Sequence, residues 1–345
     1  YHAVNQLLST PRSAGVHRRQ IPQQISHECH AQGHDRMRIR LFILFSIFWP
    51  THAAAAPDKY GVLHEERSLY TRILVHQNND LLCLKFTLVR SDSNQSCKDL
   101  AQPKRMVFTY AQMTMAALLF NPTPKRILIV GLGGGTLPMA LRELVPSSVI
   151  DTVEIDPAVI RVATDYFGYR TDAQNRIFTE DARVFGKRAK IKGQRYDLVV
   201  LDAFNGDYIP EHLMTVEYLQ EMRDLLTPNG TLVANTFSSS NLYHHESNSY
   251  RQVFGDFINY RRKDTGNRVI LIPQAQRSSD ERKPQEEALL LARADALKTR
   301  LEPYGVPITR IAEEVALADG ARPDWNLRKR PLSDQYSPAN LLRRR

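Results

Sequence analysis

The sequence predicts an α/β fold: a doubly wound, mostly parallel sheet that follows a small antiparallel β domain. From residue 104 to residue 274, apolar runs of strand length alternate with segments of helical periodicity. Continuous apolar strands separated by helices are typical of a parallel sheet covered on both faces. From residue 57 to residue 103, apolar and polar residues alternate on both sides of the polar turn QNND, and this pattern indicates antiparallel strands.

The strands of the larger sheet can be assigned in order. Those expected to be parallel are residues 126–130, 148–155, 176–180, 196–204 and 230–237, and helical segments separate them. Two further strands, at residues 256–262 and 267–273, would close the sheet by antiparallel pairing. The result is a seven-stranded Rossmann-like sheet of the methyltransferase type. Residues 108–120 have helical periodicity before it, and residues 275–345 form a linker, an amphipathic helix over 286–305 and an irregular tail.

Residues 37–56 have the pattern of a signal peptide. A basic segment that begins at Met37 precedes an apolar stretch from Leu41 to Pro50 and an alanine-rich end, as in exported proteins. The apolar stretch is too short to span a bilayer, so we expect no integral membrane span. We expect a periplasmic or secreted protein, with a cytoplasmic one as the alternative. Residues 1–36 are polar and without pattern, which predicts a disordered or untranslated extension.

The charge distribution and the cysteine content limit the classes of partner, redox compartment and metal site that can be expected. The formal net charge is +9, but the basic residues gather toward both ends of the chain, so we expect no nucleic-acid partner. Cys83 and Cys97 lie on two predicted strands joined by a turn-rich segment. They are expected either to form one disulfide, as in an oxidising compartment, or to remain free thiols. No spacing of cysteine and histidine indicates a metal site.

A glycine-rich turn, GLGGGT, follows the strand at residues 126–130 and opens a helix. In that position backbone N–H groups and a helix N-terminus are presented to a ligand. A turn needed only for tight packing of strand and helix is the alternative. Gly131, Gly133 and Gly135 give a G-x-G-x-G spacing, whose third glycine comes one residue earlier than in G-x-G-x-x-G. This spacing fits an adenosyl sulfonium, which has no phosphates, at least as well as a dinucleotide.

Acidic residues end the next two predicted strands. Glu154 ends the second strand, about twenty residues beyond the glycines, and Asp181 follows the third. Glu154 is placed to accept hydrogen bonds from ribose hydroxyls, and an acidic group after the third strand could accept one from the adenine amine. Because the carboxyl ends of parallel strands meet at one edge of a sheet, these residues together predict a nucleoside site. Capping of the following helices is the alternative role.

The fourth strand ends in LDAFNGDYIP, which places Asp202, Asn205 and Asp207 where open α/β sheets bind substrate. An attacking amine needs an acceptor that holds its ammonium form, takes its proton and leaves its lone pair aimed at an electrophilic carbon. Either aspartate is a candidate for this role. A polar turn in which Asp202 caps a backbone amide is the alternative.

The order of these motifs resembles that of the polyamine aminopropyltransferases, the spermidine synthase family. The similarity runs from about Tyr60 to Phe257 through FTYAQM, ILIVGLGGGTL, VEID, EDA, YDLVVLDAF and PEHLMTVEYLQEMRDLL. The tail at residues 331–341 is similar to the ending of a spermidine-synthase-like branch of the family.

The resemblance implies transfer of an aminopropyl group from decarboxylated S-adenosylmethionine to an amine such as putrescine. The donor would be a co-substrate rather than a tightly bound cofactor. The sequence leaves the oligomeric state open, with a homodimer as one candidate because dimers are common in the family. The implied site residues fall into three groups. Catalysis is assigned to Asp202, which matches the first carboxylate of the family's Asp-x-x-Asp loop, and to Asp207, the nearby replacement for the second. Nucleoside binding is assigned to Gly131, Gly133, Gly135, Glu154, Asp181 and Ala182, and amine binding to Tyr110, Asn205 and Pro210.

Several positions depart from the family pattern. Gly134 stands where the family has the aspartate that holds the donor's ammonium, and Asn205 stands where it has the second carboxylate of Asp-x-x-Asp. Tyr110-Ala111-Gln112 replaces Tyr-His-Glu, and Thr71 replaces an early glutamine. Because losing a carboxylate paired with a cation in a dry site weakens cation binding strongly, the amine half is expected to be eroded. Two alternatives follow: a methyltransferase using intact S-adenosylmethionine, for whose carboxylate Gly134 makes room, and a non-catalytic exported protein that binds an adenosyl metabolite or polyamine.

Overall fold

The computed structural model describes residues 61–87, 94–206, 208–240, 242–274 and 283–336. All of them belong to one compact unit, residues 55–345. The predicted extension at residues 1–36 and signal peptide at residues 37–56 lie outside the described residues, so both stay predictions, as does the expected localisation. None of the described helices is both long and apolar enough to cross a bilayer.

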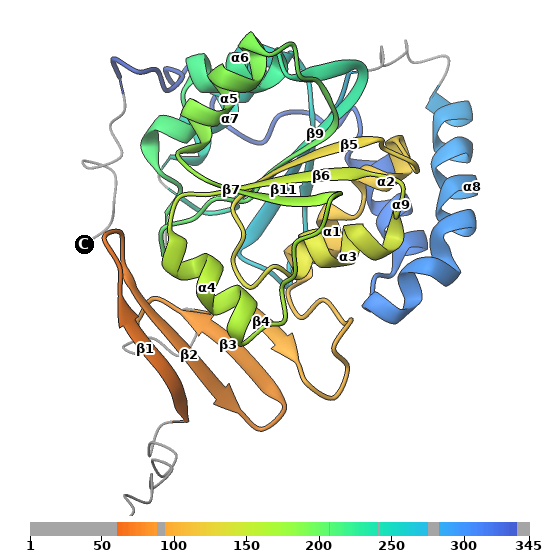
Figure 1. Cartoon of the computed structure of the whole chain (residues 1–345). Coiled ribbons are helices and arrows are strands. Elements are labelled where there is room, and N and C mark those ends of the chain that lie inside the picture. The colour runs from red at the N-terminus through yellow and green to blue at the C-terminus, as the bar shows by residue number, and fades with distance from the viewer. Residues whose placement is uncertain (1–60, 88–93, 207, 241, 275–282, 337–345) are drawn as a thin grey trace, which may run out of the picture. The chain divides into compact units, whose positions relative to one another are not determined.

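The small β domain is a four-stranded antiparallel sheet whose strands pair in chain order (Figure 1). Its strands are β1 (Val62–Arg67), β2 (Arg72–Asn78), β3 (Leu81–Lys85) and β4 (Asn94–Asp99). Ile73 and Val75 of β2 pack against Val159 and Val162 of helix α4 (Pro157–Asp165). This shared core attaches the small sheet to the larger one.

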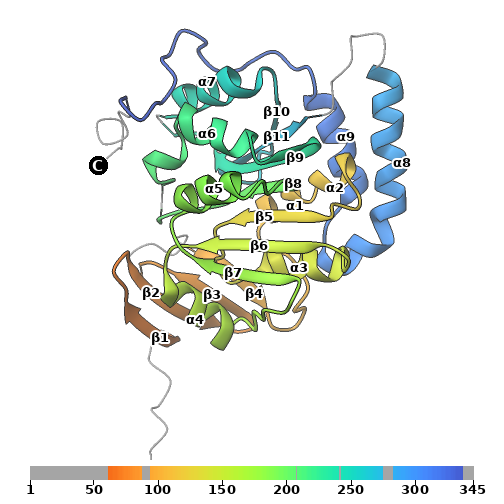
Figure 2. The ribbon, with the colours of Figure 1, turned by 45° about the horizontal axis from the view of Figure 1, so that its top comes forward.

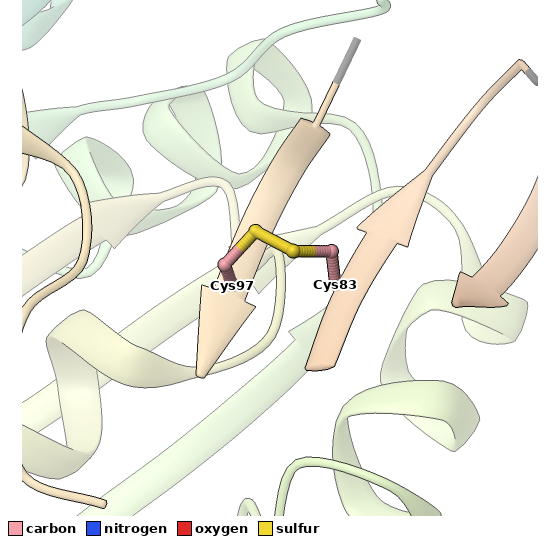
Figure 3. The surroundings of a disulfide bond; sticks show 2 residues. All are labelled: Cys83 and Cys97. Carbon is pink, nitrogen blue, oxygen red and sulfur yellow. A yellow bond between two sulfur atoms is a disulfide. The ribbon is translucent and has the colours of Figure 1, made fainter. Parts of the chain in front are cut away.

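Cys83 and Cys97 face each other as register partners on β3 and β4. They form a disulfide (Figure 3), and each side chain is only 3% exposed. The sequence left a disulfide and two free thiols open, and the structure has the disulfide.

The larger sheet has seven strands in the order β10-β11-β9-β8-β5-β6-β7. They are β5 (Arg126–Val130), β6 (Val149–Glu154), β7 (Asn175–Thr179), β8 (Tyr196–Leu201), β9 (Leu226–Phe237), β10 (Ile258–Arg261) and β11 (Asn267–Pro273). Strands β5 to β9 pair in parallel, whereas β11 pairs antiparallel with both β9 and β10. The predicted fold class, including the two closing antiparallel strands, is confirmed.

Helices cover both faces of this sheet because its strands carry apolar side chains on both faces. In β5, Ile127 and Ile129 face one core, and Leu128 and Val130 face the other. The first core contains α1 (Thr109–Thr114), α2 (Ala117–Phe120), α3 (Thr136–Leu144), α8 (Lys283–Leu301) and α9 (Ile308–Ala318). The second contains α5 (Ala182–Ile191), α6 (Val216–Arg223) and α7 (Tyr243–Phe254), which lie together in Figure 2.

Three helical regions differ from the sequence prediction. The helix expected over 108–120 is divided at Met115 into α1 and α2. Helix α7 is not predicted because its buried face carries polar residues, Glu246 and Ser247 among them, so it lacks an apolar stripe. Helices α8 and α9 pack into the core of the sheet, whereas the sequence assigned residues 275–345 to a separate segment and did not identify α9.

Candidate active site

A cavity of about 670 Å³ lies where the carboxyl ends of the parallel strands meet. Strands β5 and β8 are its neighbours at the point where the strand order reverses, the place where open α/β sheets bind ligands. Every described residue of the predicted site lines it except Gly135: Tyr110, Gly131, Gly133, Glu154, Asp181, Ala182, Asp202, Asn205 and Pro210. Asp207 lies outside the described residues, and its catalytic role stays a prediction.

Two glycines of the turn serve different contacts. Gly131 has φ +99°, and a Cβ on it would lie 2.3 Å from the backbone oxygen of Asp202. Only glycine therefore lets the ends of β5 and β8 come this close. Gly135 has φ +75°, and its Cβ would lie 2.7 Å from the ring of Tyr169 rather than at the cavity wall. The expectation that Gly135 lines the nucleoside is not met, because this position faces a packed ring.

Gly134 is closely surrounded. A Cβ there would lie 2.8 Å from Cδ1 of Phe167 and 2.9 Å from Oγ of Ser96. The small sheet and the residues after α4 therefore fill the space that a side chain would need. The expectation that Gly134 makes room for the carboxylate of an intact donor is wrong, since the freed volume is occupied by protein.

We predict that Gly134→Asp, which restores the family's aspartate, destabilises the fold by about 1–3 kcal/mol and does not raise activity, because overpacking forces the buried Phe167 ring to move. Urea unfolding measures the loss. Gly266→Asp is the matched control, since nothing lies within 4 Å of a Cβ at that position. Equal unfolding midpoints for the two variants would contradict the prediction.

Glu154 is held at the glycine turn by two backbone amides. Its Oε2 accepts a hydrogen bond from the N–H of Leu132 at 3.0 Å, and its Oε1 accepts one from the N–H of Asp156 at 3.0 Å. Burial raises the pKa of Glu154, and these backbone N–H groups oppose the shift. Helix α4 is capped by Asp156 instead. The N–H of Ile155 also bonds to this carboxylate. Three donors leave one of about four acceptor positions on the two oxygens for a ribose hydroxyl.

Asp181 divides its two oxygens between capping and the cavity. Oδ1 accepts the N–H groups of Arg183 and Val184 at 2.9 and 3.0 Å, and so caps α5. Oδ2 lies 3.0 Å from Nε2 of His212. Burial, the largest single effect, acts to raise the pKa of Asp181, but the Val184 amide, His212 and the remaining contacts outweigh it and the pKa lies below its ordinary value. Asp181 therefore caps α5 with Oδ1, while its Oδ2 contacts His212 in the cavity lining.

Asp202 is a partly buried carboxyl group in the wall of the cavity. Its Oδ1 accepts a hydrogen bond from Nδ2 of Asn235 at 2.8 Å, and the Tyr110 hydroxyl bonds to it as well. Burial raises the pKa of Asp202 to about 7, although both hydrogen bonds act to lower it. Burial also raises the pKa of Tyr110, and the neighbouring Asp202 adds to the shift. A carboxyl that titrates near neutral pH is suited to accept a proton.

A chain of side-chain hydrogen bonds leads through Asn267 and Asn235 to Asp202. Thr265 donates to Oδ1 of Asn267 at 3.2 Å, and Nδ2 of Asn267 donates to Oδ1 of Asn235 at 2.9 Å. Asn235 in turn donates a hydrogen bond to Oδ1 of Asp202. The sequence patterns did not single out Asn235, Asn267 or His212 as site residues, although an asparagine inside the predicted buried strand at residues 230–237 was a signal for the first.

The loop after β8 completes the wall of the cavity. Nδ2 of Asn205 donates to the Tyr208 hydroxyl at 2.9 Å, which fixes the amide that replaces the family's second carboxylate. Pro210 precedes the short 3-10 helix η1 (Glu211–Leu213), which carries His212 into the lining.

The cavity is strongly acidic. No lysine or arginine is among the described residues that line it. Its carboxylates are Glu154, Asp156, Glu180, Asp181, Asp202 and Asp264. In the described part of the chain, no cluster of three or more histidine, cysteine, aspartate or glutamate side chains could hold a metal ion. The acidic lining favours a cationic ligand.

Comparisons with known proteins identify the family of this chain. Residues 107–277 match the family described as spermine/spermidine synthase domain. A polyamine aminopropyltransferase of Vibrio vulnificus is 46% identical over 305 residues, which cover 88% of this chain and 98% of that protein. The human eEF1A lysine and N-terminal methyltransferase is 32% identical over 139 residues, 36% of this chain and 20% of that protein.

The crystal structure of a probable spermidine synthase from Corynebacterium glutamicum shares the fold. Its TM-score is 0.54 at 20% identity, covering 76% of this chain and 96% of that chain. The long alignment with the Vibrio protein is the stronger finding, because it extends over nearly the whole relative. This chain belongs to the spermine/spermidine synthase family.

Proposed function

We propose that this chain transfers an aminopropyl group from decarboxylated S-adenosylmethionine to a primary amine such as putrescine, releasing methylthioadenosine. The observation that carries the proposal is a single acidic cavity that joins Glu154 and Asp181 at one part of its wall to Asp202 at another. The membership of the family and the name of the Vibrio relative support the same reaction.

The nucleoside half supports binding of an adenosyl ligand. The carboxylate of Glu154 is fixed by two backbone amides beside the glycine turn, so it is oriented before a ribose arrives. The donor's sulfonium and the acceptor's ammonium are both cations, and a wall of carboxylates without a lining lysine or arginine among the described residues attracts both.

Asp202 has the surroundings of a proton acceptor. In the reaction the bound ammonium first loses a proton, because only the neutral amine has a lone pair. The carboxylate of Asp202, whose pKa is raised to about 7, can take that proton and return it to solvent. The amine nitrogen then attacks the methylene carbon next to the sulfonium, the carbon–sulfur bond breaks, and the sulfur keeps the electron pair as a neutral thioether. Asp207 is the second predicted catalytic carboxylate.

The test titrates decarboxylated S-adenosylmethionine, S-adenosylmethionine and methylthioadenosine separately into the full chain by calorimetry, and then measures turnover with putrescine. We expect tighter binding of the decarboxylated donor than of the carboxylated one, and release of methylthioadenosine with a new carbon–nitrogen bond. Preference for intact S-adenosylmethionine with methyl transfer would replace the proposal by the methyltransferase alternative. Absence of binding for all three ligands would overturn it.

A further inference from the structure

His212 occupies the part of the cavity where the adenine amine is expected. Its Nε2–H donates to Oδ2 of Asp181 at 3.0 Å, and the imidazole lines the cavity. The motif PEHLMTVEYLQEMRDLL contains this histidine, but neither the sequence pattern nor the proposed reaction assigns it a role.

The free hydrogen-bonding capacity of Asp181 is limited. Its Oδ1 already accepts two backbone N–H groups of α5. The remaining oxygen, Oδ2, is the one that His212 holds. An adenine amine that bonds to Asp181 must therefore approach Oδ2, the oxygen that the imidazole of His212 already contacts.

The imidazole can leave without disturbing the core. The side chain of His212 is 48% exposed, and it belongs to the three-residue helix η1. The next residue, Leu213, is buried in the core formed with α5, α6 and α7. A rotation of the His212 side chain therefore needs no movement of the backbone that Leu213 anchors.

We propose that His212 is a gate at the adenine end of the site: its ring holds Asp181 when the site is empty, and the adenine 6-amino group displaces it. The inference rests on the proposed function, since it needs an adenosyl ligand in this cavity. Each binding event then exchanges one hydrogen bond to Asp181 for another. His212 consequently lowers the affinity for adenine nucleosides and eases release of the nucleoside product.

The test is a thermodynamic cycle with two ligands, methylthioadenosine and its analogue in which hydrogen replaces the 6-amino group. Calorimetry gives the dissociation constant of each for the wild-type chain and for His212→Ala. We expect His212→Ala to bind methylthioadenosine about tenfold more tightly, the usual scale of a hydrogen bond to a charged group. Binding of the analogue, which displaces nothing, should stay unchanged. The preference for the amino-bearing ligand therefore rises by the same factor.

Three further variants separate the possible causes. His212→Gln keeps a donor for Asp181 and should retain the wild-type preference, whereas His212→Phe keeps ring volume without that donor and should behave like His212→Ala. His76→Ala, on β2 outside the cavity lining, is the control for removal of a histidine. An unchanged or reduced preference in both His212→Ala and His212→Phe would overturn the gate. Failure of the wild-type chain to bind methylthioadenosine would instead overturn the proposed function.

Discussion

Asp202→Asn is expected to lower kcat/KM for the amine by about a hundredfold or more, the usual contribution of a positioned proton acceptor. Asparagine has nearly the same shape, and its amide oxygen can still accept the hydrogen bond that Asn235 donates. The variant should therefore fold normally, and the loss should reflect chemistry at one atom. Steady-state turnover with saturating donor measures it, and urea unfolding checks that the fold is retained.

The pH dependence follows from the pKa of Asp202, which burial raises to about 7. Below that pH the carboxyl is protonated and cannot accept a proton, so kcat/KM should rise as the pH increases through about 7. In the complex, the positively charged donor favours the carboxylate form. The rise of kcat with pH should therefore occur at lower pH than the rise of kcat/KM.

The variants of the two predicted catalytic carboxylates distinguish their roles. The residual activity of Asp202→Asn should lack the rise near neutral pH, whereas Asp207→Asn should keep it. If Asp202→Asn retains both wild-type turnover and the rise, another group accepts the proton, and Asp207 is the first candidate. Loss of the rise in Asp207→Asn alone would assign the role to that residue.

The carboxyl-edge residues were predictable because one geometric rule governs them. In a parallel sheet the ends of neighbouring strands meet at one edge, so Glu154, Asp181 and Asp202 could be expected to share a site before any contact was known. The closing strands were equally predictable, since β11 has an apolar run and β10, in which buried Ile258 and Tyr260 alternate with polar residues, precedes it across a turn.

Other site features depend on tertiary contacts that the sequence pattern does not encode. The space at Gly134 is filled by Phe167 and Ser96, which belong to segments far from the glycine turn in the chain. Asn267 reaches Asp202 only through Asn235, because β11 lies beside β9 in the folded sheet. His212 comes from a 3-10 turn too short for a periodic signal.

Helix α7 was likewise not predictable from the sequence pattern, because residues on its buried face are polar. The buried ion pair on that face leads to the second prediction. Arg268 of β11 is 0% exposed and donates from Nη2 to Oε2 of Glu246 at 2.9 Å. Its other nitrogens donate to Ser247 Oγ at 2.7 Å and to Thr236 Oγ1 at 2.6 Å. The guanidinium carbon lies 4.1 Å from the centre of the Tyr243 ring. One buried cation thus bonds to two polar residues on the buried face of this helix, Glu246 and Ser247, whereas Oε1 of Glu246 has no hydrogen-bond partner.

Arg268→Met should destabilise the fold by about 3–5 kcal/mol, because it leaves the carboxylate of Glu246 buried without a cation. Burial already raises the pKa of Glu246, and Arg268 opposes the shift. Without the arginine this pKa rises further, so the protonated form is favoured in the folded state. A group with a raised pKa in the folded state stabilises it most at low pH and loses that contribution as the pH rises. Urea unfolding should therefore show a larger loss at pH about 8 than at pH about 5.

A second substitution at Glu246 isolates the cause of that loss. In the double variant Arg268→Met, Glu246→Met both charges are absent, and a buried ion pair replaced by apolar side chains is often neutral, so much of the stability should return and its extra pH dependence should disappear. Arg310→Met is the matched control: its side chain is 61% exposed and pairs with Glu314, and an exposed pair contributes about 0–1 kcal/mol. If Arg268→Met costs no more than this control, or if the double variant is as unstable as the single one, the unpaired carboxylate is not the source of the destabilisation.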